Sequence, residues 1–338
     1  MNTFEDHTQD IERLTVTKPY VIGLCIMEQK ALFGIVDARG EVLASESVLM
    51  EDYPDPTTFA FDVCDKILPM VERCGGMEKI KAMGISACSG NNMNGCIENP
   101  ANLSWKGKIS LAKMFQGCLA IPVSLMNDAT AAAMGEMAFG NAHGLQNFVA
   151  IIMNMGLGSG IFVNNRIVRG YSGRVGEIGH TTIFPGGRPC GCGNRGCLES
   201  YVSRRGIIGN MQDLLRQRPE VATPLRDIPV EELTIEDIVQ ACEAGDEMAL
   251  ECLRYTGDIL GKALVPVANF INPEAFILCG MVGSVCGKYM QKAILEALNN
   301  NQFFPMRWQT RVLVSDLKLD EAPLLYASAE AWNTKVNG

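Results

Sequence analysis

The sequence lacks any run of apolar residues that approaches the roughly 18 needed for a membrane-spanning helix. Its first residues, MNTFEDHTQDIERL, are acidic and contain no apolar stretch, so they do not resemble a signal peptide. Basic residues are outnumbered, with 29 Lys and Arg against 38 Asp and Glu, which gives a net charge of -9 and a pI near 5.0. These absences argue against a membrane protein and against an extended nucleic-acid surface. They favour a cytoplasmic location.

The cysteine pattern of a disulfide scaffold is also missing, although the chain contains 13 cysteines. They are spread through apolar runs, as Cys25, Cys64 and Cys279 are, which favours free thiols in a reducing compartment. The 338 residues are 47% hydrophobic and 20% charged, as in ordinary globular proteins, and suffice for two domains with their own cores. No linker or low-complexity segment marks a domain boundary.

One glycine-rich stretch, residues 176–200, combines an imidazole with three thiols: GEIGHTTIFPGGRPCGCGNRGCLES. Four N/S donors suit tetrahedral zinc, and a site filled by four protein ligands leaves no open position for catalysis. The alternative is that these are unrelated buried thiols. We predict a structural zinc site that also fixes two carboxylates, Glu177 and Glu199. Its ligands would be His180, Cys190, Cys192 and Cys197.

Two similar patterns of strands and helices follow one another along the chain. The first begins near residue 20 with three short strands and tight turns, which predicts an antiparallel meander. Residues 87–107, rich in Asn and Gly, are predicted to form a long functional loop. The predicted strands are 20–26, 31–37, 42–48, 80–86 and 121–126, and the predicted helices are 57–73, 110–118 and 128–139.

The second pattern begins near residue 147 with another meander, in which Asn164-Asn165 suits a tight hairpin turn. Thr234, with Asp237 three residues later, predicts the start of a helix, and Pro266 is expected to kink a long helix. The predicted strands are 147–153, 158–164, 166–172, 275–280 and 311–315, and the predicted helices are 204–217, one from 234, 246–271, 284–299 and 322–333.

This repeat predicts an α/β protein of two lobes with a ligand-binding cleft between them. We expect a flexible tail at 1–17, an N-terminal lobe at 18–130 completed by helix 322–333, and a C-terminal lobe at 131–320. The predicted zinc loop, 180–199, belongs to the second lobe.

The chain resembles the ROK family of bacterial sugar kinases and sugar-responsive repressors over about residues 18–335. The motifs that carry this resemblance are MNDATAAAMGE, GLGSGIFVNNRIVRG and GEIGH…CGCGNRGCLES. Among its members the ROK glucokinases look most similar. The resemblance implies two actin-like (ribonuclease-H-like) lobes around a cleft for sugar and nucleotide, with a structural zinc loop.

The resemblance also implies a sugar site, in which carboxylates and amides hold hydroxyl groups through charge-assisted hydrogen bonds. Asp128 matches the general base that takes a proton from the acceptor hydroxyl, although it could simply cap helix 128–139. Asn102 could equally belong to a turn, and Trp105 is better explained by packing than by stacking on a sugar. The matching residues are Asn102, Asn127, Asp128, Glu177, His180 and Glu199.

The nucleotide side departs from the family pattern. Where ROK kinases have Asp-x-Gly-Gly-Thr, this chain has Cys25-Ile26-Met27-Glu28-Gln29. The loop thus lacks the Asp that helps place the metal nucleotide and the glycines that let backbone N–H groups approach phosphate. Glu28 adds a negative charge where the triphosphate would lie. Like charges about 4 Å apart repel by roughly 4 kcal/mol at an effective dielectric constant near 20.

Two further nucleotide loops differ as well. The family's Gly-Thr-Gly reads Asn154-Met155-Gly156, and its Gly-Gly-Gly reads Cys279-Gly280-Met281. Glycines that match the family, and that would contact nucleotide in a working kinase, remain at Gly156, Gly158, Gly160 and Gly280.

We therefore predict a protein that binds a hexose, of the glucose or N-acetylhexosamine type, with weak or lost ATP phosphotransfer and a role in sugar sensing or regulation. One alternative is an active ATP-dependent hexose kinase using Mg²⁺ and Asp128 as base. A second is a transcriptional regulator or corepressor without its own DNA-binding domain, because only about 18 residues precede the first strand. The expected partners are a sugar and a second copy of the chain, with neither nucleic acid nor membrane.

Overall fold

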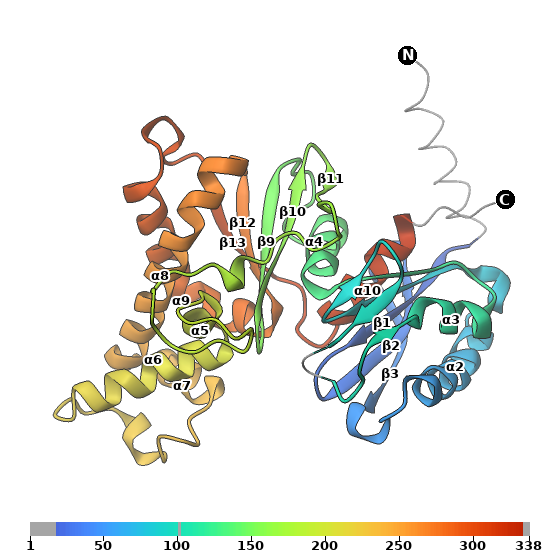
Figure 1. Ribbon diagram of the computed structural model, residues 1–338, viewed down its shortest axis with the longest axis horizontal. Coiled ribbons are helices and arrows are strands. Elements are labelled where there is room, and N and C mark those ends of the chain that lie inside the picture. Colours follow the sequence, from blue (N-terminus) through green and yellow to red (C-terminus); the bar gives the residue numbers. More distant parts are fainter. Residues whose placement is uncertain (1–17, 101–102, 334–338) are drawn as a thin grey trace. The chain divides into compact units, whose positions relative to one another are not determined.

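The computed structural model describes residues 18–100 and 103–333, which fall into two compact units (Figure 1). Unit 1 comprises the described residues up to Phe139, the segment Arg169–Arg174 and those from Asp320 onward. Unit 2 comprises Gly140–Val168 and Val175–Leu319. The predicted tail, 1–17, lies outside the described residues.

Unit 1 is built on a five-stranded mixed sheet with the order β3-β2-β1-β4-β8. The first three strands form the predicted antiparallel meander, and β4 and β8 extend it in parallel with β1. The near-continuous apolar runs of β1 and β4 are buried, as expected for strands covered on both faces. The strands are β1 (Tyr20–Ile26), β2 (Lys30–Asp37), β3 (Val42–Leu49), β4 (Ile80–Ala87) and β8 (Val123–Asn127).

Helices pack on this sheet through apolar residues at helical spacing. The side chains of Phe59 and Phe115, from α2 and α3, meet edge to face in one core. Helix α10 packs against β1, β4 and α4, and it lies so close that a Cβ on Gly84 would sit 2.0 Å from the carbonyl oxygen of Ala327. Glycine at 84 therefore permits this contact. The helices are α2 (Pro56–Arg73), α3 (Leu111–Leu119), α4 (Asp128–Phe139) and α10 (Ala322–Asn333).

The predicted long loop 87–107 contains two short strands, which form a small sheet with a third strand just after it, and the prediction had not included these strands. Three short strands pair antiparallel in the order β5-β6-β7. Each has only two or three residues, too few for an alternating pattern to show in the sequence. The strands are β5 (Gly90–Asn91), β6 (Cys96–Glu98) and β7 (Lys108–Ile109).

Unit 2 repeats the sheet of unit 1 with the order β11-β10-β9-β12-β13, again an antiparallel meander extended by two parallel strands. Asn164 and Asn165 both have positive φ, which confirms the predicted tight turn. The strands are β9 (Phe148–Met153), β10 (Leu157–Val163), β11 (Arg166–Ile167), β12 (Ala275–Cys279) and β13 (Arg311–Val314).

The predicted strand 166–172 was wrong beyond Ile167. From Arg169 to Arg174 the chain belongs to unit 1, where the guanidinium of Arg169 pairs with Glu330 on α10 at 3.3 Å. Positive φ at Gly170 and Gly173 takes the backbone out of extended geometry.

The long helix α8 contacts the other helices of unit 2, α5, α6, α7 and α9, and packs most closely against α9 (Figure 1). Thr234 and Asp237 form the predicted capping box at α7, and α8 continues through Pro266. Helix α9 begins at Gly280, four residues before the predicted start. The helices are α5 (Glu199–Val202), α6 (Arg204–Gln217), α7 (Ile235–Glu243), α8 (Glu247–Ile271) and α9 (Gly280–Asn301).

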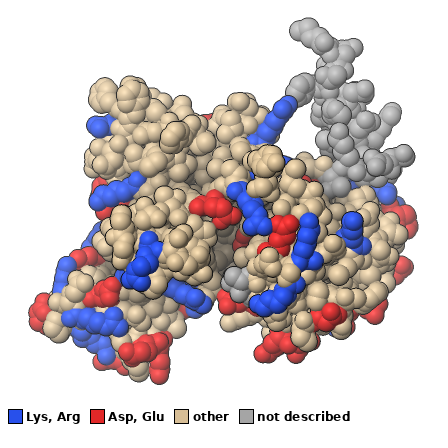
Figure 2. All heavy atoms as spheres, in the orientation of Figure 1, with Lys and Arg blue, Asp and Glu red and all other residues tan. Residues whose placement is uncertain are grey.

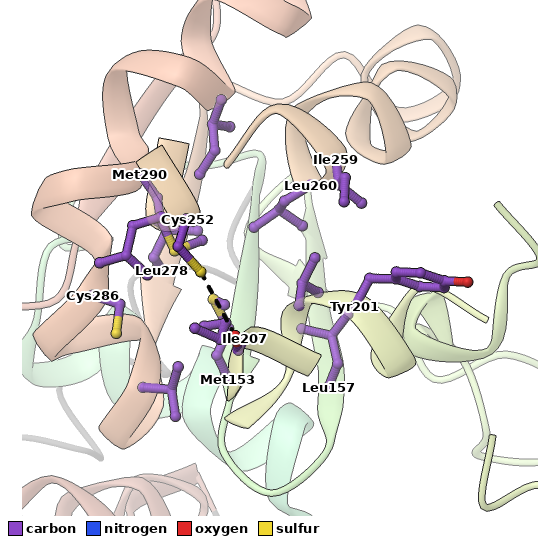
Figure 3. Packing of buried hydrophobic residues seen from close by; sticks show 14 of the residues in the cluster. Met153, Leu157, Tyr201, Ile207, Cys252, Ile259, Leu260, Leu278, Cys286 and Met290 are labelled. Atoms are coloured by element: carbon purple, nitrogen blue, oxygen red, sulfur yellow. Dashed lines mark hydrogen bonds between the residues drawn. The ribbon is translucent and has the colours of Figure 1, made fainter. Parts of the chain in front are cut away.

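The core of unit 2 lies between these helices and the sheet. Figure 3 shows Met153 and Leu278, from the central strands, close to Met290 and Cys286 of α9. The thiol of Cys252 on α8 donates to the carbonyl oxygen of Ile207 on α6 at 3.7 Å, which joins two helices through this core.

The surface carries both signs of charge. On the face that Figure 2 shows, Lys and Arg side chains lie interspersed with Asp and Glu. Within the described residues, no helix combines the length and hydrophobicity that crossing a membrane demands.

Candidate functional site

The four predicted zinc ligands converge in unit 2. His180 ends the short 3-10 helix η3 (Ile178–His180), and Cys197 lies two residues before the first residue of α5. The potential ligand atoms of His180, Cys190, Cys192 and Cys197 all lie within 4.8 Å of one another. The Cys192 and Cys197 sulfurs are 3.7 Å apart, as are the Cys190 sulfur and the His180 Nδ1. Tetrahedral ligands about 2.3 Å from zinc lie roughly 3.8 Å apart, so the donor set fits this metal.

Tight backbone turns bring these ligands together. The N–H of Gly193 donates to the carbonyl of Cys190, and the N–H of Cys190 donates to the carbonyl of Asn194. Gly196 has φ 79°, and a Cβ there would lie 1.7 Å from the carbonyl oxygen of Phe184. Glycine is thus required at Gly196 by a positive φ and by lack of space, and Gly193 is favoured by its φ of 92° alone, whereas Gly191 has neither constraint.

The neighbouring arginine fastens the loop to the rest of unit 2. The guanidinium of Arg188 lies over the ring of Tyr201, 4.7 Å from its centroid. It donates to Asn210 Oδ1 at 2.8 Å and to Asp213 Oδ2 at 2.6 Å, both on α6. The Tyr201 hydroxyl accepts the Arg188 backbone N–H at 2.8 Å. The loop is therefore held on both sides of the cysteine cluster.

The cysteines of the cluster differ in pKa, which determines which of them must lose a proton when a metal binds. A backbone hydrogen bond at Asn194 lowers the pKa of Cys192, whereas burial raises that of Cys197 to about 12. Because zinc binds thiolates, a thiol with a raised pKa loses its proton as the metal binds.

Glu199 and His180, two of the predicted sugar-contacting residues, approach the same sulfur. The thiol of Cys190 lies 3.6 Å from Glu199 Oε1 and 3.7 Å from His180 Nδ1. The second oxygen of Glu199 accepts the backbone N–H of Leu157 at 2.9 Å. Glu177 immediately precedes η3 and is exposed.

In unit 1, other predicted site residues lie at one edge of the sheet, where the carboxyl ends of three parallel strands meet. Asn127 is the last residue of β8 and Asp128 the first of α4. Their Oδ1 atoms accept the same N–H, that of Ala129, at 2.8 and 2.9 Å. Asn127 Oδ1 also accepts the N–H of Thr130 at 3.4 Å, so Asn127 is the capping residue of α4, and Asp128, its first residue, adds only a second acceptor for the Ala129 N–H.

The sequence analysis also interpreted Trp105 and Asn102, and the structure tests only the first of these interpretations. Trp105 is 2% exposed, and its indole N–H donates to the carbonyl of Tyr53 at 2.8 Å, which confirms the packing interpretation. Asn102 lies outside the described residues.

The segment 25–29, which stands where ROK kinases have Asp-x-Gly-Gly-Thr, lies at the same edge of the sheet and includes the last two residues of β1. Cys25 is buried and faces Ser86 in the register of β1 and β4. Burial, with the nearby charge of Asp128 as a smaller cause, raises the pKa of the Cys25 thiol to about 12. This side chain is therefore uncharged at neutral pH. The following residues Glu28 and Gln29 are exposed in the turn to β2.

The two other segments that differ from the family's nucleotide loops, 154–156 and 279–281, contact each other in unit 2. Asn154 follows β9, and its Oδ1 accepts the backbone N–H of Met281 at the start of α9 at 2.8 Å. The sequence analysis missed this contact because 127 residues separate the two positions. It also missed a network in unit 1 in which Glu98 accepts hydrogen bonds from Asn91, Asn94 and Arg174.

The model of the ROK family matches residues 21–328 of the chain, which include both sheets and the His-Cys cluster. The chain belongs to the ROK family. It therefore has the family's actin-like α/β fold, and its His-Cys cluster is the family's zinc motif.

Relatives of this ROK chain include both enzymes and regulators. A glucokinase of Streptomyces coelicolor is 32% identical over 263 residues, which are 77% of this chain and 81% of that protein. The transcriptional dual regulator NagC of Escherichia coli is 32% identical over 212 residues, 63% of this chain and 50% of NagC. A ROK glucokinase of Streptomyces griseus, solved with glucose and AMPPNP, matches with a TM-score of 0.79 and 28% identity over 93% of this chain and all of that one.

Proposed function

We propose that this ROK protein binds a hexose, of the glucose or N-acetylhexosamine type, and has weak or lost ATP-dependent phosphotransfer. Its role would be sugar sensing or regulation. The ROK relatives support sugar as the ligand class, because they include glucokinases and N-acetylglucosamine repressors.

For the hexose, we assign hydroxyl contacts to carboxylate and amide side chains, which form strong charge-assisted hydrogen bonds with hydroxyl groups. Asp128 would be the central acceptor, and it would also be the general base in any phosphotransfer. His180 would have a double role as zinc ligand and sugar contact. The full set is Asn102, Asn127, Asp128, Glu177, His180 and Glu199.

For zinc, we propose one structural ion per chain, held by His180, Cys190, Cys192 and Cys197. The mutual distances within 4.8 Å and the N/S donor chemistry support it. Bound there, the ion would brace the loop that carries Glu199 and supply no open coordination position.

One observation carries the proposal of weak phosphotransfer: the buried, uncharged Cys25 at the end of β1. A neutral thiol with a pKa of about 12 does not offer Mg²⁺ the oxygen anion that this hard ion prefers. Phosphoryl transfer depends on positioning and charge stabilisation, so an intact Asp128 does not replace a missing hold on the triphosphate.

Two other functions have support of their own. The identity to glucokinases favours an active ATP-dependent kinase, with Gly156, Gly158, Gly160 and Gly280 approaching the nucleotide. The similarity to NagC favours a regulator or corepressor, although the match covers only half of NagC.

Calorimetric titration with glucose, N-acetylglucosamine and mannose, with and without ATP-Mg²⁺, tests the sugar half. We expect binding of at least one sugar without nucleotide. A coupled assay tests the other half, and we expect no measurable glucose phosphorylation. Turnover near one per second or faster, within the usual range of kinases, would establish the active-kinase alternative instead.

We also propose that the chain forms a homodimer, and an aromatic patch on unit 2 supports this. Its members, Phe270, Phe303, Phe304 and Trp308, are 88, 64, 76 and 73% exposed. The Phe303 N–H donates to Asn269 Oδ1 at 3.1 Å, which brings the end of α8 to the loop after α9.

An aromatic side chain offers about 150–250 Å², so the patch presents roughly 450–750 Å². A stable interface needs about 800 Å² per partner. Light scattering should give a dimer at micromolar concentration and a monomer for Phe270→Ser with Phe304→Ser. A monomeric unmodified protein, or a double variant that stays dimeric, would contradict this assignment.

A further inference from the structure

The turn between β9 and β10, together with the first residue of β10, contacts the first turns of three helices in unit 2. The carbonyl oxygen of Asn154 accepts the N–H of Arg204, the first residue of α6, at 2.9 Å. Its side-chain oxygen accepts the N–H of Met281, the second residue of α9, at 2.8 Å. Glu199, the first residue of α5, accepts the N–H of Leu157 at 2.9 Å. The turn is thus where three separate helix starts are joined.

Helix α9 depends on this turn for its cap. The first N–H groups of a helix have no partner within the helix and carry partial positive charge, so they bind capping oxygens or anionic ligands. The N-cap residue of α9, Cys279, makes no side-chain capping hydrogen bond. The oxygen at Met281 comes instead from Asn154, 127 positions away in the sequence.

The fit around this oxygen is close. Gly280 has φ 77°, and a Cβ there would lie 2.8 Å from Asn154 Oδ1 and 2.8 Å from the carbonyl oxygen of Met153. Asn154 is also fixed through its backbone, since its N–H donates to the carbonyl of Gly156 at 3.0 Å. An external phosphate oxygen therefore reaches the Met281 N–H only if the Asn154 side chain moves away.

We propose that Asn154 is a specificity-determining residue: its amide oxygen takes the position of a ligand oxygen at the start of α9 and excludes phosphate groups from it. The contact keeps the turn and the helix start ordered without a nucleotide. This inference rests on the proposed function, in which the chain binds sugar without efficient phosphotransfer. It names the residue that closes the helix start at which the proposed function, in its kinase alternative, places Gly280 against the nucleotide.

The test compares two substitutions at one position. Asn154→Gly removes the oxygen and frees the Met281 N–H, whereas Asn154→Asp keeps an oxygen there and adds a negative charge. Hydrogen exchange of the amides of residues 281–283 reports the cap. Titration with ATP-Mg²⁺ and with inorganic pyrophosphate reports the exclusion.

For Asn154→Gly we expect amide exchange at Met281 to rise at least tenfold and affinity for both probes to rise at least tenfold. Asn154→Asp should keep the protection and leave both affinities at or below those of the unmodified protein. Asn165→Gly is the matched control, because it is the same substitution at a hairpin turn with positive φ in the same unit. It should change neither readout.

Unchanged exchange at residues 281–283 in Asn154→Gly would overturn the capping role, and raised exchange without any gain in affinity would overturn the exclusion. If Asn154→Gly does not fold, Asn154→Ala removes the same oxygen and retains a Cβ. The proposed function fails separately, through rapid glucose phosphorylation by the unmodified protein, so the two failures are distinguishable.

Discussion

The two units contain five-stranded sheets of the same strand order, but the residues at the carboxyl end of the first strand, β1 or β9, differ. In unit 1, the last residue but one of β1 is the buried and uncharged Cys25, which lies opposite Ser86 of β4 in the same sheet. In unit 2, β9 ends at Met153 and is followed by Asn154, whose amide oxygen accepts the Met281 N–H of α9. The matching strand order shows that the sheet itself tolerates either solution. Differences in chemistry between the units therefore arise at strand ends.

The insertions between the strands differ more strongly. Unit 1 places its small sheet, β5-β6-β7, after β4 and holds it through hydrogen bonds to Glu98. Unit 2 places the His-Cys cluster and four helices between β11 and β12. One insertion is thus held by a polar network and the other by a metal-type cluster, and each is open to a direct test.

The largest effect should come from the cluster in unit 2. Cys192→Ser removes one of four donors, and because a structural metal site contributes folding energy, we expect the free energy of unfolding to fall by at least about 3 kcal/mol. Elemental analysis should show about one zinc per unmodified chain and far less in the variant. Thermal unfolding measures the loss.

Cys74→Ser provides the control for this prediction. Cys74 is half-buried at the end of α2 in unit 1 and lies outside the cluster. Its substitution should leave the zinc content unchanged. An unmodified protein purified without zinc, or equal stability losses in the two variants, would refute the assignment of a structural metal.

The next effect concerns the end of β1. Cys25→Asp puts a carboxylate into a buried position near Asp128, so we expect a loss of about 2–4 kcal/mol in the free energy of unfolding. Cys25→Ser, which is neutral and of similar size, is the control in urea unfolding. If Asp costs no more than Ser, the position accepts a carboxylate as a kinase site would, and the contrast between the strand ends weakens.

A smaller effect is expected at Asp128. Asp128→Asn should weaken sugar binding by roughly 10- to 100-fold, because a hydrogen bond to a charged group contributes about 1.5–3 kcal/mol. Stability should change by less than about 0.5 kcal/mol, since Asn127 also accepts the Ala129 N–H. Calorimetry with the best sugar and urea unfolding separate the two effects. Intact sugar affinity with lowered stability would leave Asp128 as a helix cap only.

The sequence was informative where a local pattern determines the structure. The apolar runs of the central strands, the Asn164-Asn165 turn and the Thr234–Asp237 capping box each depend on neighbouring residues, and each was predicted. The His-Cys cluster followed from spacing alone, because three thiols within eight residues have few ways to converge.

The remaining features depend on distant contacts. The strands β5, β6 and β7 are too short to show a period, and β11 ends early because residues from Arg169 join unit 1. The cap of α9 by Asn154 joins positions 127 residues apart. Neither propensity nor spacing contains such information, since the partner of each group is decided by the folded topology.

The smallest expected effect returns to the polar network that holds the insertion of unit 1. Hydrogen bonds from Asn94 and Asn91, with Arg174 nearby, lower the pKa of Glu98 to about 2. Because the folded pKa is below the ordinary value near 4.5, the carboxylate stabilises the fold fully above pH 4.5. That contribution is lost as the pH falls towards 2.

Glu98→Gln should therefore lower the free energy of unfolding by about 1 kcal/mol at pH 7, a value that allows for solvent screening of a partly exposed pair. The difference between variant and unmodified protein should shrink between pH 4.5 and pH 2.5 in urea unfolding. Glu46→Gln, at an exposed ion pair with Lys66 in the same unit, should show no such convergence. A constant difference across this pH range would mean that packing, rather than the charge of Glu98, holds the insertion, and the contrast with the metal-type cluster of unit 2 would then lose its electrostatic basis.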